Sequence, residues 1–214
     1  GRLKLTYLLA GVSAIIGILI AVPLGVLSAL NRNSWLDVSV SALASLGTAM
    51  PNFWLGLMLI IVFSVQLGWF PVFGSDSLRA IVLPATCLGT GMAARLSRLT
   101  RSSMLEALRQ DYMRTARSKG LKPRRVNVVH ALRNALIPVI TALGLQLGWL
   151  LGGSVVVESV FAWPGLGRLV IESIHVRDIT VLQAAVFWFS FSFIMINLIV
   201  DLLYSVVDPR VKVE

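Results

Sequence analysis

Five stretches of the chain contain no charged residue and are rich in apolar side chains. They cover residues 5–31, 38–75, 80–94, 134–157 and 179–200. A helix needs about 20 residues to cross a hydrocarbon core of about 30 Å, so four of the five are long enough on their own. The run 80–94 is shorter and can span if Arg79 and Arg95 extend their side chains to opposite interfaces.

The run 38–75 is too long for one straight span, because a helix rises only about 1.5 Å per residue. Pro51 predicts a kink. The segment 67–74, with Trp69 and Phe70, is typical of an exit at headgroup depth. Two full spans would leave almost no residues for a turn, so we expect one span here. The pattern therefore predicts an all-α polytopic membrane protein with five transmembrane helices.

Composition supports a membrane protein. Hydrophobic residues make up 57% of the 214 residues, charged residues make up 14%, and the mean hydropathy is +0.83. About a quarter of the residues of a soluble domain are charged. The chain starts with Gly1 and its first span follows almost at once. We expect one transmembrane domain over 1–214, without a targeting segment and lacking a first N-terminal span.

The positive charge lies in one segment. Residues 95–133 carry eleven Lys and Arg against only Glu106 and Asp111, and this excess equals the whole formal net charge of +9. The positive-inside rule places this segment in the cytoplasm. Counting spans, 31–37 and the C-terminal DPRVKVE lie on the same side.

The loops 67–79 and 158–178 are then expected outside. The acids of 158–178 outnumber its bases, which agrees with that side. Arg2 and Lys4 would also lie outside, against the positive-inside rule.

The basic segment has the pattern of a helical hairpin. Apolar and small residues recur at three- and four-residue spacings over 103–119, which predicts an amphipathic helix. Gly120 suits a left-handed C′ position, and Pro123 prevents continuation. A second helix is expected from Pro123 into the next span, with Pro138 near the membrane surface. We expect a cytoplasmic loop over 98–134.

Such a helix could lie on anionic lipid or dock in a groove of a soluble partner. Thr115, Ala116, Ser118 and Gly120 are small, so another backbone could approach closely. This favours a protein partner.

Several segments together resemble the permease subunits of bacterial ABC importers, in the dipeptide, oligopeptide and nickel group. They are SMLEALRQDYMRTARSKGL, HALRNALIPVIT, GGSVVVESVFAWPGLGRLV and NLIVDLLYSVVDPRV. The resemblance covers essentially the whole chain. It implies the MetI-like permease fold and a place in the bacterial inner membrane as a multi-pass transport protein.

In that superfamily an E-A-A-x-x-x-G loop forms a coupling helix that docks on the ATPase subunit. Gly120 matches its glycine, and Arg114 stands where the glutamate would be. His130 and Arg133 likewise replace the isoleucine and proline of a downstream I-x-L-P element. The resemblance assigns ATPase coupling to Glu106, Tyr112, Arg114, Thr115, Ala116, Lys119, Gly120 and Leu121.

The resemblance also implies partners. They are cytoplasmic ATP-binding subunits, a second homologous permease subunit, an extracytoplasmic solute-binding protein and the lipid bilayer, without nucleic acid. ATP would be bound by the partner, since this chain has no G-x-x-x-x-G-K-[ST] loop, and we expect no cofactor of its own.

The sequence contains no recognisable group of catalytic or metal-binding residues, so we expect that the protein is not an enzyme. The topology puts His130 and His175 on opposite sides of the membrane, and Cys87 is the only cysteine. The GLG at 165–167 lacks the strand context of a phosphate loop and is typical of a tight turn.

Polar and small residues inside the spans are candidates for the pore or substrate path, where unpartnered polar groups are costly. They are Asn52, Gln146, Gly148, Ser154, Trp163 and Gly165. Gly144 and Gly148 form a GxxxG pattern that predicts close packing at the pore or with the second permease subunit. Asn197 is a further polar residue, and Asp201 suits either a gate or the cytoplasmic interface.

The sequence thus favours one permease half of an ATP-driven importer, working by alternating access. A secondary transporter or channel without an ATPase is the alternative, but it would be expected to carry paired ionisable groups mid-span. The solute stays open among dipeptides, oligopeptides, glutathione, opines and nickel.

Overall fold

The computed structural model describes residues 1–75 and 77–207, and all regular secondary structure in this part of the chain is helical. Its elements are α1 (Arg2–Leu30), α2 (Trp35–Ala49), α3 (Asn52–Leu59), the π-helix η1 (Ile60–Gln66), α4 (Val82–Arg109), α5 (Asp111–Ser118), α6 (Pro123–Arg125), the π-helix η2 (Val126–Leu132), α7 (Arg133–Val160), α8 (Leu166–Val176) and α9 (Ile179–Val207). The all-α prediction is confirmed for these residues.

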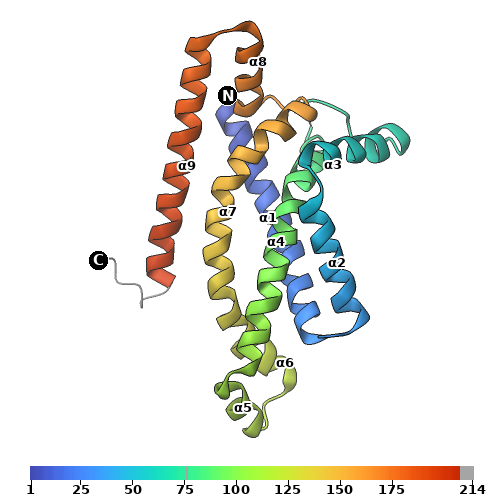
Figure 1. Ribbon diagram of the computed structural model, residues 1–214, viewed down its shortest axis with the longest axis vertical. Coiled ribbons are helices and arrows are strands. Elements are labelled where there is room, and N and C mark those ends of the chain that lie inside the picture. The colour runs from blue at the N-terminus through green and yellow to red at the C-terminus, as the bar shows by residue number, and fades with distance from the viewer. Residues whose placement is uncertain (76, 208–214) are drawn as a thin grey trace.

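The centre of the bundle is the pair α1 and α4, which pack closely through small residues (Figure 1). A Cβ added to Gly25 would lie 2.6 Å from the Cβ of Thr100, and one added to Gly89 would lie 2.9 Å from the carbonyl oxygen of Ser13. Small side chains allow helices in a membrane to approach until their backbones nearly touch. The α1–α4 contact therefore depends on glycine at these positions.

The long apolar run breaks where Pro51 predicts it. α2 ends at Ala49, Met50 and Pro51 are extended, and α3 begins at Asn52 with a bend of 106°. The thiol of Cys87 on α4 donates to the carbonyl oxygen of Asn52 at 3.2 Å. The only cysteine thus stabilises the broken backbone.

The remaining helices surround this pair (Figure 1). α7 packs on α4 and α1, α2 lies on the other side of α4, and α9 packs on α7 and α8. One end of the bundle carries α5 and α6, and we call it the hairpin end. The opposite end carries α8 and the N-terminus, and we call it the α8 end.

Length and composition identify three helices able to cross a membrane: Arg2–Leu30, Val126–Val160 and Ile179–Val200. The bent pair α2 and α3–η1 makes a fourth if it counts as one broken span. The fifth predicted span, 80–94, lies in α4, which is not among them. Four arginines follow the apolar half of α4, so the count of five remains a prediction.

Loops predicted on the same side do lie at the same end. The loop 31–34 is at the hairpin end, and α8 is at the other. Arg2, which conflicted with the charge rule, donates to the carboxylate of Glu172 in α8 at 2.7 Å. A specific acidic partner therefore accounts for this cation at the α8 end. The C-terminal DPRVKVE lies outside the described residues.

The hairpin corrects one prediction. The helix expected over 103–119 is not continuous: α4 ends at Arg109, Gln110 is extended, and α5 starts at Asp111. The turn folds Met113 and Ala116 back, so that both are buried with Met104 of α4. A straight helix would have carried these side chains away from that cluster into solvent. Burial of apolar surface therefore overrides helical continuity here.

The C-terminal half of the hairpin follows the sequence. Gly120 has φ +71°, as predicted for its C′ position. Pro123 opens α6, and the chain continues through η2 into α7, which includes Pro138.

The GxxxG pattern of α7 faces α9 of the same chain. A Cβ on Gly148 would lie 2.7 Å from the ring of Phe193, and one on Gly144 would collide with Val200. The close approach predicted from the pattern is present. Its partner within the described residues is α9, and a role of this span at the pore or at a second subunit stays a prediction.

Gly148→Leu is expected to push α9 away from α7, with a cost of about 1–3 kcal/mol for overpacking. Gly152→Leu, one turn along α7, is the matched control, because a Cβ there meets no atom within 4 Å. Thermal unfolding of the purified protein in detergent should show a lower midpoint for Gly148→Leu than for Gly152→Leu. Equal midpoints would contradict the packing described.

The sidedness can be tested by thiol labelling in intact cells after replacement of Cys87. A cysteine at exposed Ser118, at the hairpin end, should resist a membrane-impermeant reagent, whereas one at Val176 should react. Val176 is chosen because its side chain is 75% exposed, whereas neighbouring Ser173 is only 3% exposed and bonds the carbonyl oxygen of Leu169. Labelling at Ser118 alone would reverse the orientation.

Candidate functional site

The hairpin presents a polar surface on an apolar anchor. Ala116 is buried and Leu121 packs against the same cluster, whereas Arg114, Thr115 and Lys119 are exposed. The hydroxyl of Thr115 donates to the carbonyl oxygen of Asp111 within α5 at 3.3 Å. The predicted coupling residues therefore separate into anchors and an exposed face that a partner can contact.

Glu106 and Tyr112 line a cleft of about 450 Å³ between the end of α4, α5 and the start of α7. Asn134 closes one side of it, donating to the Tyr112 hydroxyl at 3.1 Å and to the carbonyl oxygen of His130 at 2.9 Å. This places two predicted coupling residues beside one cleft at the hairpin end.

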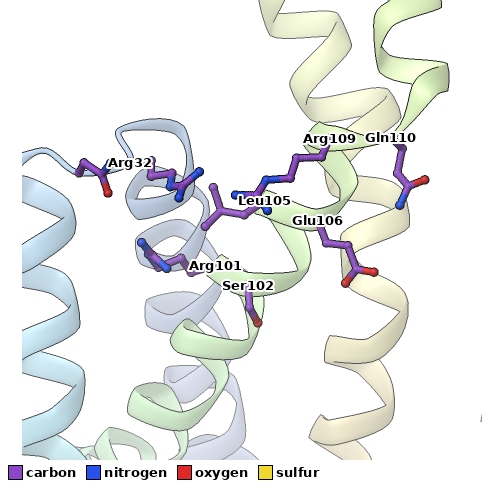
Figure 2. A pocket seen from close by; sticks show the side chains of 8 residues that line it. Arg32, Arg101, Ser102, Leu105, Glu106, Arg109 and Gln110 are labelled. Atoms are coloured by element: carbon purple, nitrogen blue, oxygen red, sulfur yellow. The ribbon is translucent and has the colours of Figure 1, made fainter.

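A second cleft, of about 600 Å³, lies on the other side of α4. Figure 2 shows Arg109 extending past Leu105 toward Arg32 of the loop 31–34, whereas Glu106 and Gln110 point to the opposite side of the helix. The cleft is therefore lined by cations on the side that faces this loop.

Below that cleft an ion pair joins three elements. Arg101 of α4 donates to both carboxylate oxygens of Asp37, from Nε at 2.6 Å and from Nη2 at 2.8 Å. Asp37 also accepts from the Ser28 hydroxyl of α1 at 2.5 Å and from the Asn33 backbone N–H at 3.0 Å. Bidentate pairs of this kind fix orientation as well as distance. α1, α2 and α4 are thus tied together at the hairpin end.

Two of the predicted pore residues lie near one arginine. Arg95 of α4 donates from Nε to the side-chain oxygen of Gln146 on α7 at 2.9 Å. Arg95 and Asn52 both line a small cavity of about 80 Å³ beside the break at Pro51. The structure therefore differs from the expectation that Arg95 reaches out to the membrane surface, because its side chain is bonded across to α7.

The other pore candidates are packed within this chain. Gly148 lies against α9, as described above. Ser154 is buried and donates to the carbonyl oxygen of Leu151. Trp163 is buried, and its indole N–H donates to the carbonyl oxygen of Leu5 at 3.2 Å. Gly165 lies against a carboxylate at the α8 end, and none of these four shares the cavity of Arg95.

That carboxylate belongs to Glu158, which is fully buried and which the sequence reading treated only as a loop charge. It accepts from the Thr6 hydroxyl at 2.7 Å and from the Arg168 backbone N–H at 3.1 Å. The Thr6 oxygen in turn accepts from the Leu166 backbone N–H at 2.8 Å. Glu158 thus joins α7 to α1 and to the first turn of α8.

The glycines of AWPGLG fit closely around this group. A Cβ on Gly167 would lie 2.5 Å from the Cα of Val155 and 3.0 Å from a Glu158 oxygen. A Cβ on Gly165 would collide with the same carboxylate. The GLG predicted as a tight turn is instead the start of α8, with Gly165 at its N-cap, and its glycines leave room for this acid.

The outer face of α8 carries a charge network. Glu172 accepts from Arg2 at 2.7 Å and pairs with Arg168 at 2.8 Å. The hydrogen bond from Arg2, with further help from both positive charges, holds the pKa of Glu172 below its ordinary value. Both arginines are partly exposed, so solvent screening keeps the contribution to stability small.

Asp37, Arg95 and Glu158 are the polar residues whose roles the sequence did not reveal. The first and last lie at or just beyond the edge of a charge-free run, where a charge is usually interpreted as a sign of topology. A sequence signal could have identified the two acids. It is an acid at the edge of an apolar run, together with a Ser or Thr at the same depth in another span.

Comparison with known proteins identifies the family. Residues 21–213 match the family described as binding-protein-dependent transport system inner membrane component. The chain belongs to this family. The sequence motifs resemble those of ABC importer permeases, and the family match confirms this resemblance.

Curated relatives in this permease family are similar over most of the chain. The glutathione transport system permease protein GsiC of Pectobacterium atrosepticum is 47% identical over 99% of this chain. GsiC of Escherichia coli strain K12 is 50% identical over 88% of it. The matched region spans 69% of the first relative's length and 61% of the second's.

Solved structures share the fold. The MetNI methionine ABC transporter, in an inward-facing form, matches with a TM-score of 0.83 and 24% identity, covering 97% of this chain and 94% of that chain. An amino acid ABC transporter matches with a TM-score of 0.67 and 20% identity, covering 98% and 92%. The MetI-like permease fold predicted from the sequence is confirmed.

Thr6→Val is expected to lower stability by about 1–3 kcal/mol, because it removes the hydroxyl that joins the Glu158 carboxylate to the Leu166 N–H. Thr141→Val is the matched control, since that hydroxyl bonds only to the carbonyl oxygen of Ile137 in its own helix. Thermal unfolding in detergent measures the difference. If both variants unfold at the same temperature, the buried network does not hold the α8 end together.

Proposed function

We propose that this chain is one membrane-spanning permease subunit of an ATP-driven importer in the bacterial inner membrane, forming half of a path for small peptides. The single observation that carries the proposal is the hairpin, whose apolar side is buried against α4 and η2 while its polar side is exposed. Membership of the binding-protein-dependent permeases agrees with it.

The segment 103–121 would couple this subunit to a cytoplasmic ATPase subunit. In this proposal Arg114, Thr115 and Lys119 contact the ATPase, because they are exposed on an element held firmly from behind. Glu106 and Tyr112 line the adjoining cleft and would form its edge. ATP is bound by the partner, and this chain supplies the docking surface.

The complete transporter would also contain a second permease subunit and a binding protein outside the membrane. Closure of the ATPase dimer would move α5, and the packing of α5 against α4 and η2 would carry that motion into the membrane helices. Rigid-body rocking between inward- and outward-open states is the conformational repertoire expected of such a system.

Glutathione or another small peptide is the cargo that we propose. The support is the similarity to proteins named as glutathione transport system permeases. Nickel and opines are handled by other members of the group that the motifs resemble, and uptake measurements with each solute would separate them.

The coupling role is tested at Gly120. Gly120→Val should weaken association with the ATPase subunit and reduce transport, because a β-branched residue at φ +71° costs about 1–2 kcal/mol. Gly120→Asn should be milder, since asparagine tolerates the left-handed region. A Cβ there meets no atom within 4 Å, so the difference measures backbone conformation and not crowding.

Neutralising Arg124 and Arg125 together is the charge control, and it should be milder than Gly120→Val because other cations preserve the orientation of the loop. Co-purification of the ATPase subunit, ATPase activity and transport are measured for each variant in nanodiscs. Normal association and transport in Gly120→Val, together with loss of both in the double arginine variant, would refute a role for the shape of the hairpin.

A further inference from the structure

Arg95 lies on α4 at membrane depth, on the side that faces Gln146 of α7. Gly17 of α1 lies against Met92, and Gly25 lies against Thr100, so Arg95 is level with the part of α1 between these glycines. From Gly25 five residues of apolar helix remain before α1 ends, which is roughly 8 Å. The backbone of Arg95 therefore lies level with the apolar part of α1.

No acid in the described part of the chain pairs with this guanidinium group. Its one hydrogen bond runs from Nε to the neutral side chain of Gln146, and the Nη groups are left without a described partner. The side chain is exposed within this single chain. A positive charge at this depth is costly and is normally matched by an anion or by a water-filled path. Something outside this chain is therefore required to compensate it.

The cavity beside Arg95 is polar and small. Thr48 and Asn52 line it together with Trp149, and it exists because the helix breaks between α2 and α3. Its volume is about 80 Å³, which leaves room for a carboxylate group. Non-helical backbone at membrane depth is tolerated where it lines such a cavity.

We infer that Arg95 receives a carboxylate of the transported solute, with the neutral polar groups of Thr48 and Asn52 completing the site. This inference rests on the proposed function and narrows its cargo. A fixed cation in the path attracts solutes that carry a carboxylate and repels a bare metal cation. The site therefore favours carboxylate-bearing peptides over free nickel.

The first experiment measures the charge preference of the cavity without any cargo. Thr48→Cys, in a Cys87→Ser background, is reacted with negatively and positively charged methanethiosulfonates in the assembled transporter. Arg95 should raise the ratio of the rate with the negative reagent to the rate with the positive reagent, since fixed charge concentrates counter-ions in clefts by tenfold or more. Arg95→Gln should lower this ratio about tenfold, and Arg95→Lys should preserve it.

Arg79→Gln is the matched control, because this arginine is exposed outside the bundle helices and far from the cavity in the fold. It should leave the ratio unchanged. An unreactive cysteine at position 48, or a ratio that does not respond to Arg95→Gln, would overturn the inference. If the second permease subunit no longer co-purifies with Arg95→Gln, the inference would also be overturned. Arg95 would then pair with an acid of that subunit and not with the solute.

The second experiment measures uptake into proteoliposomes with the binding protein present. The probes are glutathione and its diamide, in which both carboxylates are replaced by carboxamides. Because the binding protein is the same throughout, the change in the ratio of the two kcat/KM values reports the permease step. Arg95→Gln should lower the ratio of acid to diamide about tenfold, and Arg79→Gln should not.

The two proposals fail in different ways. Absence of ATP-driven glutathione uptake by the unmodified transporter counts against the proposed cargo, while the cysteine rates still decide whether the cavity selects anions. Equal losses of both probes in Arg95→Gln would overturn the inference, because the residue would then act on the transport cycle and not on the carboxylate.

Discussion

The close contact between α1 and α4 is the constraint on which the rest of the bundle depends. Water does not drive helices together inside a bilayer, so association relies on packing, and packing relies on residues small enough for the backbones to meet. Gly25 and Gly89 supply this at two levels. Because α4 is fixed there, its arginines and the hairpin at its end acquire defined positions relative to every other helix.

Polar ties fasten the two ends of this apolar contact. Asp37 joins α1, α2 and α4 at the hairpin end, and Glu158 joins α1, α7 and α8 at the other. Both acids are buried, and a buried acid that loses its hydrogen-bond partners is costly. Directed polar contacts therefore hold the two ends of the bundle together. In the middle the helices are held by close packing of small residues, and Arg95 is the cation located there.

The sequence predicted the features that depend on residues close together in the chain. These features are the apolar runs, the break at Pro51, the conformation of Gly120 and the start of a helix at Pro123. The sequence motifs were also enough to recognise the family. Gln110, Arg95 and Glu158 could not be predicted because their states depend on distant segments. Gln110 is extended so that Met113 is buried, Arg95 is held by Gln146, and Glu158 is buried by Thr6 and α8.

The extended residue at Gln110 separates the axis of α5 from that of α4, so a push along α5 cannot travel up α4 as through a single rod. Met113 and Ala116 instead share one buried cluster with Met104 on one side and Val126 on the other. Packed interiors compress very little. In the coupling proposed above, the helices of the hairpin would move as one packed unit between α4 and the start of α7. A lateral displacement of α5 would then change the spacing of those two helices.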